Sequence, residues 1–274
     1  MQNKIDEVEI VVFDTETTGL NPSCGDRIIE IAGVRLKGYN RIGEFQSLVN
    51  PGRKVSSDAF AVNGISDEML KGAPDIREVM PRFLSFIKGS FYLCSYNAPF
   101  DMGFINNELK LLGRNELNDI IAVDILRIAR RLLPGLERYA LWFVAEKLGI
   151  QKEQKHRALS DVELTLQVFH RFKESLKVKD MDKLSDISSL FGLNSRLLND
   201  IRGQKIARIQ EAMDLGAKIK IKYLSRSATE ASERQVLPKE IRRENGEDYL
   251  VGFCCLRNEE RTFRIDNILG LEVV

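Results

Sequence analysis

The segment Ile-Val-Val-Phe-Asp-Thr-Glu-Thr-Thr-Gly-Leu, residues 10–20, decides the fold predicted for this chain. Residues 10–13 are a short apolar run rich in β-branched side chains, which predicts a strand buried on both faces inside a sheet. Asp14 and Glu16 follow on one side of that strand, roughly 6–7 Å apart, because strand side chains alternate faces. Two carboxylates at this spacing can share a metal ion. A simple turn at Asp14 is the alternative, but open α/β sheets place their sites at this end of a central strand.

The next part of the chain alternates between strands and helices, which predicts an α/β domain with a mixed sheet. We expect strands at 27–36, 44–49, 91–96 and 120–123, and helices near 66–87, 100–112 and 124–133. Asp101 falls in the first turn of a helix that follows a strand. A carboxylate there is favoured by the helix dipole alone, so this residue by itself does not indicate a site.

The segment His-Arg-Ala-Leu-Ser-Asp at residues 156–161 opens another predicted helix. Leu159, Val162 and Leu166 form its apolar face, and Asp161 borders that face rather than the solvent side. A carboxylate turned inward needs a partner or a cation. His156 taken alone is most simply a surface or core histidine.

These residues together resemble the motifs of the DEDD exonucleases, a family that includes the proofreading subunits of bacterial replicative polymerases. The resemblance covers about residues 8–175 and matches the histidine subclass, with Asp-x-Glu at 14–16, Asn-x-x-Phe-Asp at 97–101 and His-x-x-x-x-Asp at 156–161. It implies a ribonuclease H-like domain in which four carboxylates hold two divalent cations, Mg²⁺ or Mn²⁺, and His156 serves as general base. It also implies substrate contacts from a further set of residues: Thr15, Thr17, Gly19, Leu20, Gly64, Ile65 and Asn97.

The C-terminal part of the chain contains only short predicted strands after a helix at 204–215. The strands are expected at 218–224, 234–243, 249–256, 261–265 and 269–273, with a hairpin turn at Asn245-Gly246. Five such strands are sufficient for a small barrel. We therefore expect an exonuclease domain at 1–175, a helical connector at 176–205 and an all-β domain at 206–274.

This last segment resembles a WYL domain, an Sm-like or SH3-like barrel found in bacterial regulators and nucleic-acid enzymes. The match rests on Ile-Lys-Tyr at 221–223, Tyr-Leu at 249–250 and Arg-Thr-Phe-Arg-Ile-Asp at 261–266; Asp248 and Asn267 depart from the pattern. The resemblance implies a ligand or single-strand binding site formed by Tyr223, Arg234, Tyr249 and Arg264. A purely structural module is the alternative, because residues 206–274 contain twelve basic and twelve acidic residues.

The composition gives no global signal for a polyanionic partner. Lys and Arg number 41 against 40 Asp and Glu in 274 residues, a formal charge of +1, so nucleic acid must bind to local patches. Arg127, Arg130, Arg131 and Arg138 form one such concentration, for which a solvated helix face and a phosphate-facing patch are equal alternatives. Four cysteines without metal-ligand spacing, no membrane-spanning run and no signal peptide favour a cytoplasmic protein.

The function implied is a 3′–5′ exonuclease that releases nucleoside monophosphates from single-stranded 3′ ends of DNA, with RNA as a second candidate substrate and no membrane partner. The direction and the end preference follow from the resemblance and not from the residues. A ligand-sensing regulator built on a non-catalytic nuclease fold is the alternative. The complete set of four carboxylates and one histidine argues against it.

Overall fold

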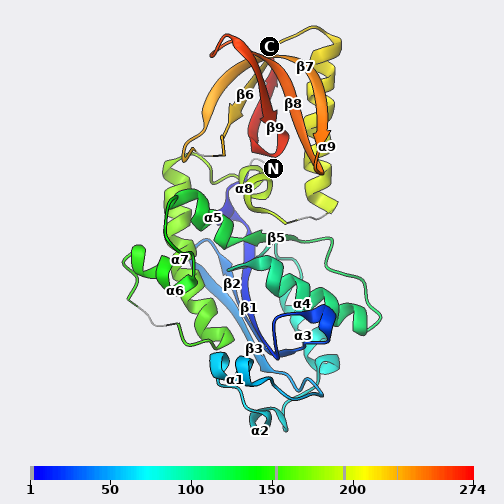
Figure 1. The fold of residues 1–274 in the computed structure, drawn as a ribbon, viewed down its shortest axis with the longest axis vertical. Coiled ribbons are helices and arrows are strands. Elements are labelled where there is room, and N and C mark those ends of the chain that lie inside the picture. The colour runs from blue at the N-terminus through cyan, green and yellow to red at the C-terminus, as the bar shows by residue number, and fades with distance from the viewer. Residues whose placement is uncertain (1–2, 152–153, 194–195, 227) are drawn as a thin grey trace.

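The computed structural model describes residues 3–151, 154–193, 196–226 and 228–274. Two five-stranded sheets organise the chain, one in each half, and Figure 1 shows the second sheet stacked above the first along the long axis. The mixed α/β class predicted for the first half and the all-β class predicted for the second are both confirmed.

The first sheet has β1 at its centre. Its strands are β1 (Glu9–Thr17), β2 (Ile28–Lys37), β3 (Asn40–Leu48), β4 (Tyr92–Ser95) and β5 (Ile121–Asp124), in the order β3-β2-β1-β4-β5. β2 runs antiparallel to β1, whereas β4 and β5 run parallel to it. Residues 10–13 are almost fully buried, as the apolar run predicts, because helices cover both faces of the sheet.

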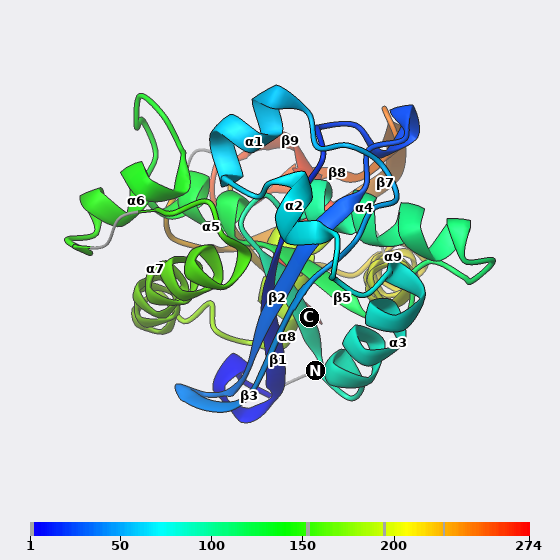
Figure 2. The same ribbon diagram turned by 90° about the horizontal axis from the view of Figure 1, so that it is seen from below.

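Helices pack on the two faces of this sheet, as Figure 2 shows. One face carries α5 (Ile125–Leu132), α6 (Leu141–Lys147) and α7 (Ala158–Val178), and the other carries α3 (Ile76–Ile87) and α4 (Ala98–Leu111). The short helices α1 (Ser57–Asn63) and α2 (Asp67–Leu70) lie near the carboxyl end of β1; the 3-10 turns η1 (Ile5–Glu7) and η2 (Pro22–Cys24) lie in connections. α1 and α6 were not predicted. No helix within the described ranges is long and apolar enough to cross a membrane.

The second half begins with α8 (Leu184–Phe191) and α9 (Arg196–Asp214). Five strands follow: β6 (Ile219–Tyr223), β7 (Ser232–Glu244), β8 (Glu247–Cys254), β9 (Glu259–Arg264) and, after η3 (Ile265–Asn267), β10 (Ile268–Val273). Their order is β10-β6-β7-β8-β9. Among the described residues no pairing joins β9 to β10, so the sheet is open, whereas the sequence led us to expect a closed Sm-like or SH3-like barrel. α9 packs against this sheet and supplies Ile209 and Ala212 to its apolar core.

The two halves share a packed junction. Leu224 and Leu269 of the second half belong to the same apolar cluster as Ile128 of α5. α8 packs against both β5 and β10. Arg131 donates from its guanidinium to the backbone carbonyl of Ser225, at 2.6 Å. The second sheet is therefore held in place against α5.

Candidate active site

Asp14 and Glu16 lie at the carboxyl end of β1, where the strand leaves the core. Phe13 is buried, and the two acids that follow it are half-buried. In the ladder with β2, Asp14 stands opposite Ala32 and Glu16 opposite Glu30. The alternation of strand side chains therefore turns both carboxylates toward the same face, as predicted.

Asp101 reaches the same region from the first turn of α4. Its side chain is 2% exposed, and its Oδ1 accepts hydrogen bonds from the backbone N–H of Thr15 at 2.9 Å and from the Thr15 hydroxyl at 2.7 Å. Ser95 donates to its other oxygen. Asn97 adopts a left-handed φ of 69°, which turns the chain from β4 into α4 and so aims Asp101 at the end of β1.

Asp161 and His156 come from the start of α7. Asp161 is 3% exposed, and its Oδ2 accepts a hydrogen bond from Gln154 Nε2 at 2.6 Å. His156 Nδ1 lies 3.9 Å from the same oxygen, and the imidazole is accessible to solvent. The other oxygen of Asp161, Oδ1, is buried and has no hydrogen-bond partner among the described residues. A buried carboxylate oxygen without a hydrogen-bond partner fits a position for a cation.

We call Asp14, Glu16, Asp101 and Asp161 the carboxylate cluster. Burial, and then the neighbouring charges, raise the pKa of Asp14 well above its usual value and that of Glu16 to about 8. Burial raises the pKa of Asp101 to about 6 although Ser95 and Thr15 donate to it. No lysine or arginine in the described part of the chain forms an ion pair with any member of the cluster.

The donor set of this cluster fits a hard divalent cation. All four ligands would be carboxylate oxygens, the type that Mg²⁺ and Mn²⁺ prefer. Within the described ranges, however, no three His, Cys, Asp or Glu side chains already converge closely enough to hold one ion. We attribute this to mutual repulsion of the acids and to the hydrogen bonds that hold Asp101 and Asp161 to their neighbours.

Sequence reasoning missed the residues that support this site. Glu30 is fully buried, and its carboxylate receives two hydrogen bonds from Arg157, both at 2.9 Å. It also accepts from the backbone N–H of Ala158, the first residue of α7. Burial alone would raise the pKa of Glu30, but the hydrogen bonds from Arg157 and Gln46 outweigh it and lower the pKa. The sequence signal that could have revealed this role was the presence of an acid, Glu30, within the apolar run at residues 28–34.

The end of β1 and the loop after it contain four of the predicted substrate-contact residues. Thr15 is buried and uses both of its donors to hold Asp101, so its role is to position that carboxylate. Thr17 is also buried, and its hydroxyl donates to the carbonyl of Gly19. A Cβ at Gly19 would collide with the Asp26 carboxylate. Leu20 is 84% exposed, so its apolar side chain is available to a bound strand.

The other three predicted contacts differ in exposure. Gly64 ends α1 in a left-handed conformation and has open space around it. Ile65 is fully buried in a small apolar cluster with Ile29 and Leu70, so its side chain supports the wall and does not face a strand. Asn97 donates its backbone N–H to Asp124 at 3.1 Å. Its side chain makes no hydrogen bond among the described residues.

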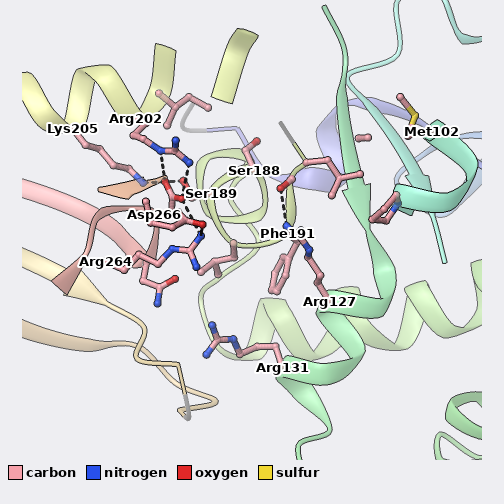
Figure 3. Close-up of a pocket in the computed structure, with 18 of the residues that line it drawn as sticks. Met102, Arg127, Arg131, Ser188, Ser189, Phe191, Arg202, Lys205, Arg264 and Asp266 are labelled. Carbon is pink, nitrogen blue, oxygen red and sulfur yellow. Dashed lines mark hydrogen bonds and ion pairs between the residues drawn. The ribbon is translucent and has the colours of Figure 1, made fainter. Parts of the chain in front are cut away.

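The residues predicted to bind a ligand in the second domain separate into two places. Tyr249 and Arg264 stand opposite each other on β8 and β9 and line a cavity of about 1170 Å³ between the two halves of the molecule (Figure 3). We call this cavity the interdomain groove. Tyr223 also lines it but is only 9% exposed. Arg234 is not part of the lining; its guanidinium lies over the ring of Tyr223, 5.6 Å from the centroid.

Comparison with known proteins agrees with both parts of this description. A family model described as Exonuclease matches residues 11–169, and a model of the WYL domain matches residues 204–273. The DNA polymerase III subunit epsilon-like protein of Rhodobacter capsulatus is 36% identical over 204 residues, which are 73% of this chain and 29% of that protein. The chain thus spans less than a third of this curated relative.

Solved structures of exonucleases have the same fold. Exonuclease X in complex with 5′ overhanging duplex DNA is 26% identical, with a TM-score of 0.50 over 61% of this chain and 92% of that one. The zinc-bound form of the E. coli ExoI–ssDNA complex is 16% identical, with a TM-score of 0.60 over 97% of this chain and 64% of that one, and shows similarity of fold alone. Because the exonuclease model spans more than half of its length, the chain belongs to the exonuclease family, and a WYL domain follows its exonuclease domain.

Proposed function

We propose that the protein is a metal-dependent 3′–5′ exonuclease that releases nucleoside monophosphates from single-stranded 3′ ends of DNA, with RNA as a second candidate substrate. The carboxylate cluster supports this most directly. Four acids gather at the end of β1 without a basic partner among the described residues, although burial and like charge oppose their ionisation. Such an arrangement is costly unless cations complete it.

Asp14, Glu16, Asp101 and Asp161 would hold two divalent cations, Mg²⁺ or Mn²⁺. When bound, such a pair stabilises charge on the attacking and leaving oxygens of a phosphodiester. Thr15 and Ser95 keep the Asp101 carboxylate in place through three hydrogen bonds. The position of the Asp101 carboxylate is thus set before a metal ion binds.

His156 is placed to accept the proton of the attacking water. It lies beside Asp161 and remains accessible to solvent, and imidazole exchanges protons near neutral pH. Its left-handed φ of 48° is a strained conformation for a side chain of this size and sets it apart from the helix that follows. Leu20, Gly64 and Asn97 would contact the terminal nucleotides.

We assign the chemistry to a ribonuclease H-like domain at residues 1–175 and nucleic-acid or ligand binding to residues 206–274, with 176–205 connecting them. The four cysteines are unpaired, which fits a reducing cytoplasm. A non-catalytic regulator is the competing function. The solvent-accessible His156 beside an intact acid cluster disfavours it, because a retired site has no reason to keep unpaired buried acids.

The test is incubation of the purified protein with 5′-labelled single-stranded and duplex DNA and RNA in Mg²⁺ or Mn²⁺. We expect a ladder of products shortened from the 3′ end, released mononucleotides, and no cleavage in EDTA until Mn²⁺ is added back. The same strands labelled at the 3′ end should release the label as a mononucleotide first. Absence of cleavage on every substrate with both metals would favour the regulator.

A further inference from the structure

The interdomain groove is a cavity that the carboxylate cluster does not explain. Its walls come from α4 and α5 of the exonuclease domain on one side and from β8, β9 and η3 on the other, with α8 and α9 at its floor (Figure 3). Its volume of about 1170 Å³ exceeds the ~300–1,000 Å³ of pockets that hold single small ligands. The size favours an extended occupant.

Basic side chains dominate the lining of the groove. Seven lysines and arginines line it against two acids, Glu247 and Asp266, in a chain whose formal charge is only +1. Basic residues come from both sides: Arg127, Arg130 and Arg131 from the exonuclease domain, and others from α9 and the WYL domain. A concave surface lined by one sign of charge concentrates the opposite ion.

Some of these cations are already neutralised. Arg202 makes two hydrogen bonds to Asp266, at 2.9 and 2.8 Å, and Arg264 lies 2.7 Å from Glu247. The guanidinium of Arg131 donates its hydrogen bonds to backbone carbonyls. These contacts hold the walls of the groove together and account for both of its acids.

Other cations have no acidic partner in the described part of the chain. Lys205 donates to the hydroxyl of Ser189 at 2.8 Å, and burial lowers its pKa to about 8. Arg130 is exposed and lies over the ring of Tyr139, with 5.8 Å from its guanidinium carbon to the centroid. Arg264, although paired with Glu247 through its Nη2, keeps a buried Nε without a hydrogen-bond partner. Because Lys205 is desolvated without a counter-ion, we expect an anion to complete the site.

Helix α4 joins the groove to the carboxylate cluster. Pro99, Met102 and Asn106 line the groove from one face of α4, because residues three and four apart share a face. Asp101, one residue before Met102, projects about 100° around the same helix, into the cluster. A chain of nucleotides could therefore pass around the first turns of α4 from one site to the other.

We propose that the interdomain groove binds the phosphodiester backbone of a nucleic-acid single strand on the 5′ side of the nucleotide held at the carboxylate cluster, with Lys205 and Arg130 contacting phosphates. This inference rests on the proposed exonuclease function. Tyr249 offers a half-buried ring on which an unpaired base can stack, a contact that the stacked bases of a duplex cannot make. The groove thus extends the substrate site and favours long strands over short ones.

The test compares binding of single strands of about 4 and about 16 nucleotides in EDTA, where no strand is cut. The variant is Lys205→Gln with Arg130→Gln. The matched control is Lys88→Gln with Lys218→Gln, which removes two exposed lysines outside the groove. Thermal unfolding verifies that both double variants are folded. Inorganic phosphate and a mononucleotide serve as competitors.

We expect the groove variant to bind the longer strand roughly 10-fold or more weakly, because each cation loses a hydrogen bond to a charged phosphate. The slope of log affinity against log salt should fall by about 1.4, or ~0.7 per phosphate contact. The control should match the unmodified protein. If the single variant Tyr249→Ala also reduces long-strand affinity, stacking contributes as proposed.

Two outcomes would overturn the inference. Equal long-strand affinity in the groove variant and the control would show that the groove does not bind the strand. Displacement of the long strand by phosphate or mononucleotide as readily as by unlabelled strand would identify a small-anion site instead. Cleavage in Mg²⁺ is scored separately, so a protein that cuts strands but does not use the groove refutes only this inference. A protein that binds strands in the groove and cuts none refutes the proposed function.

Discussion

The carboxylate cluster and the two ion pairs beside it are built from the same residue types but are balanced differently. Glu30 and Glu108 are fully buried, and each receives two hydrogen bonds from one guanidinium, that of Arg157 or Arg27. The four acids of the cluster have no such partner within the described ranges. Within the described ranges, Glu30 and Glu108 thus have a basic partner, and the four acids proposed to bind metal have none.

The interdomain groove shows the same contrast with the opposite sign. Arg202 and Arg264 are paired with acids, whereas Lys205 is not. Unpaired charge of one sign is expensive to bury, so its retention in a cavity marks the position of an absent partner.

The largest effect is expected from neutralising one of the unpaired acids of the carboxylate cluster. Asp14→Asn should reduce cleavage by about 10³-fold or more, because the bound metal contributes several kcal/mol to transition-state stabilisation. Stability in EDTA should rise, since the substitution relieves repulsion within the cluster. Product formation and thermal unfolding measure the two effects, with the exposed Glu146→Gln as control. Lower stability together with normal cleavage would place Asp14 among the structural acids.

His156 tests whether the proton acceptor can be separated from the metal ligands. His156→Ala should lower the rate by roughly 10²–10⁴-fold, the usual contribution of a general base. The deficit should shrink as pH rises, because hydroxide then replaces the assisted water. Rates from pH 6 to 9 and a Mn²⁺ titration by calorimetry give the answer. A collapse of metal affinity would make His156 a ligand.

Glu30→Gln and Glu108→Gln compare two paired acids. Each should cost about 3 kcal/mol of unfolding free energy, because a partly buried arginine loses its partner. Glu30→Gln should also lower the cleavage rate by about 10–100-fold, the usual loss when a residue that orients a ligand is changed. The reason is that Arg157, which Glu30 binds, lies between His156 and the start of α7 in the chain. Urea unfolding and cleavage rates of both variants provide the measurement. Equal loss of activity in the two would reduce Glu30 to a purely structural role.

The smallest expected effect is the pH dependence of stability without metal. The folded protein holds the pKa of Glu16 near 8, above the ordinary glutamate value, so it binds more protons than the unfolded chain between about pH 4.5 and 8. Stability should therefore fall as pH rises through that window, by about 2 kcal/mol or roughly 4–8 °C after allowance for solvent screening. Melting curves in EDTA measure it. Mg²⁺ should reverse the trend, and a flat profile would mean that the acids do not repel one another.

Local patterns in the sequence predicted the parts of the site that depend on short-range physics. The apolar run at 10–13, the alternation that aligns Asp14 with Glu16, and the strand-to-helix step before Asp101 each involve neighbouring residues only. The hairpin at Asn245-Gly246 was predicted for the same reason, because both residues adopt the positive φ that this turn requires. These features hold regardless of how distant segments pack.

Contacts between segments that are distant in the sequence determined the other features of the fold and the site. The Glu30–Arg157 pair joins residues 127 positions apart, and α9 packs against a second sheet that is open where strand count alone suggested a barrel. The interdomain groove exists only because Leu224 and Leu269 pack against the exonuclease core and bring two sets of cations together. The sequence by itself determined which charged residues the protein has and where each sits along its own strand or helix. Only tertiary packing decided which of them are neutralised, because a counter-ion acts through distance in space and not along the chain.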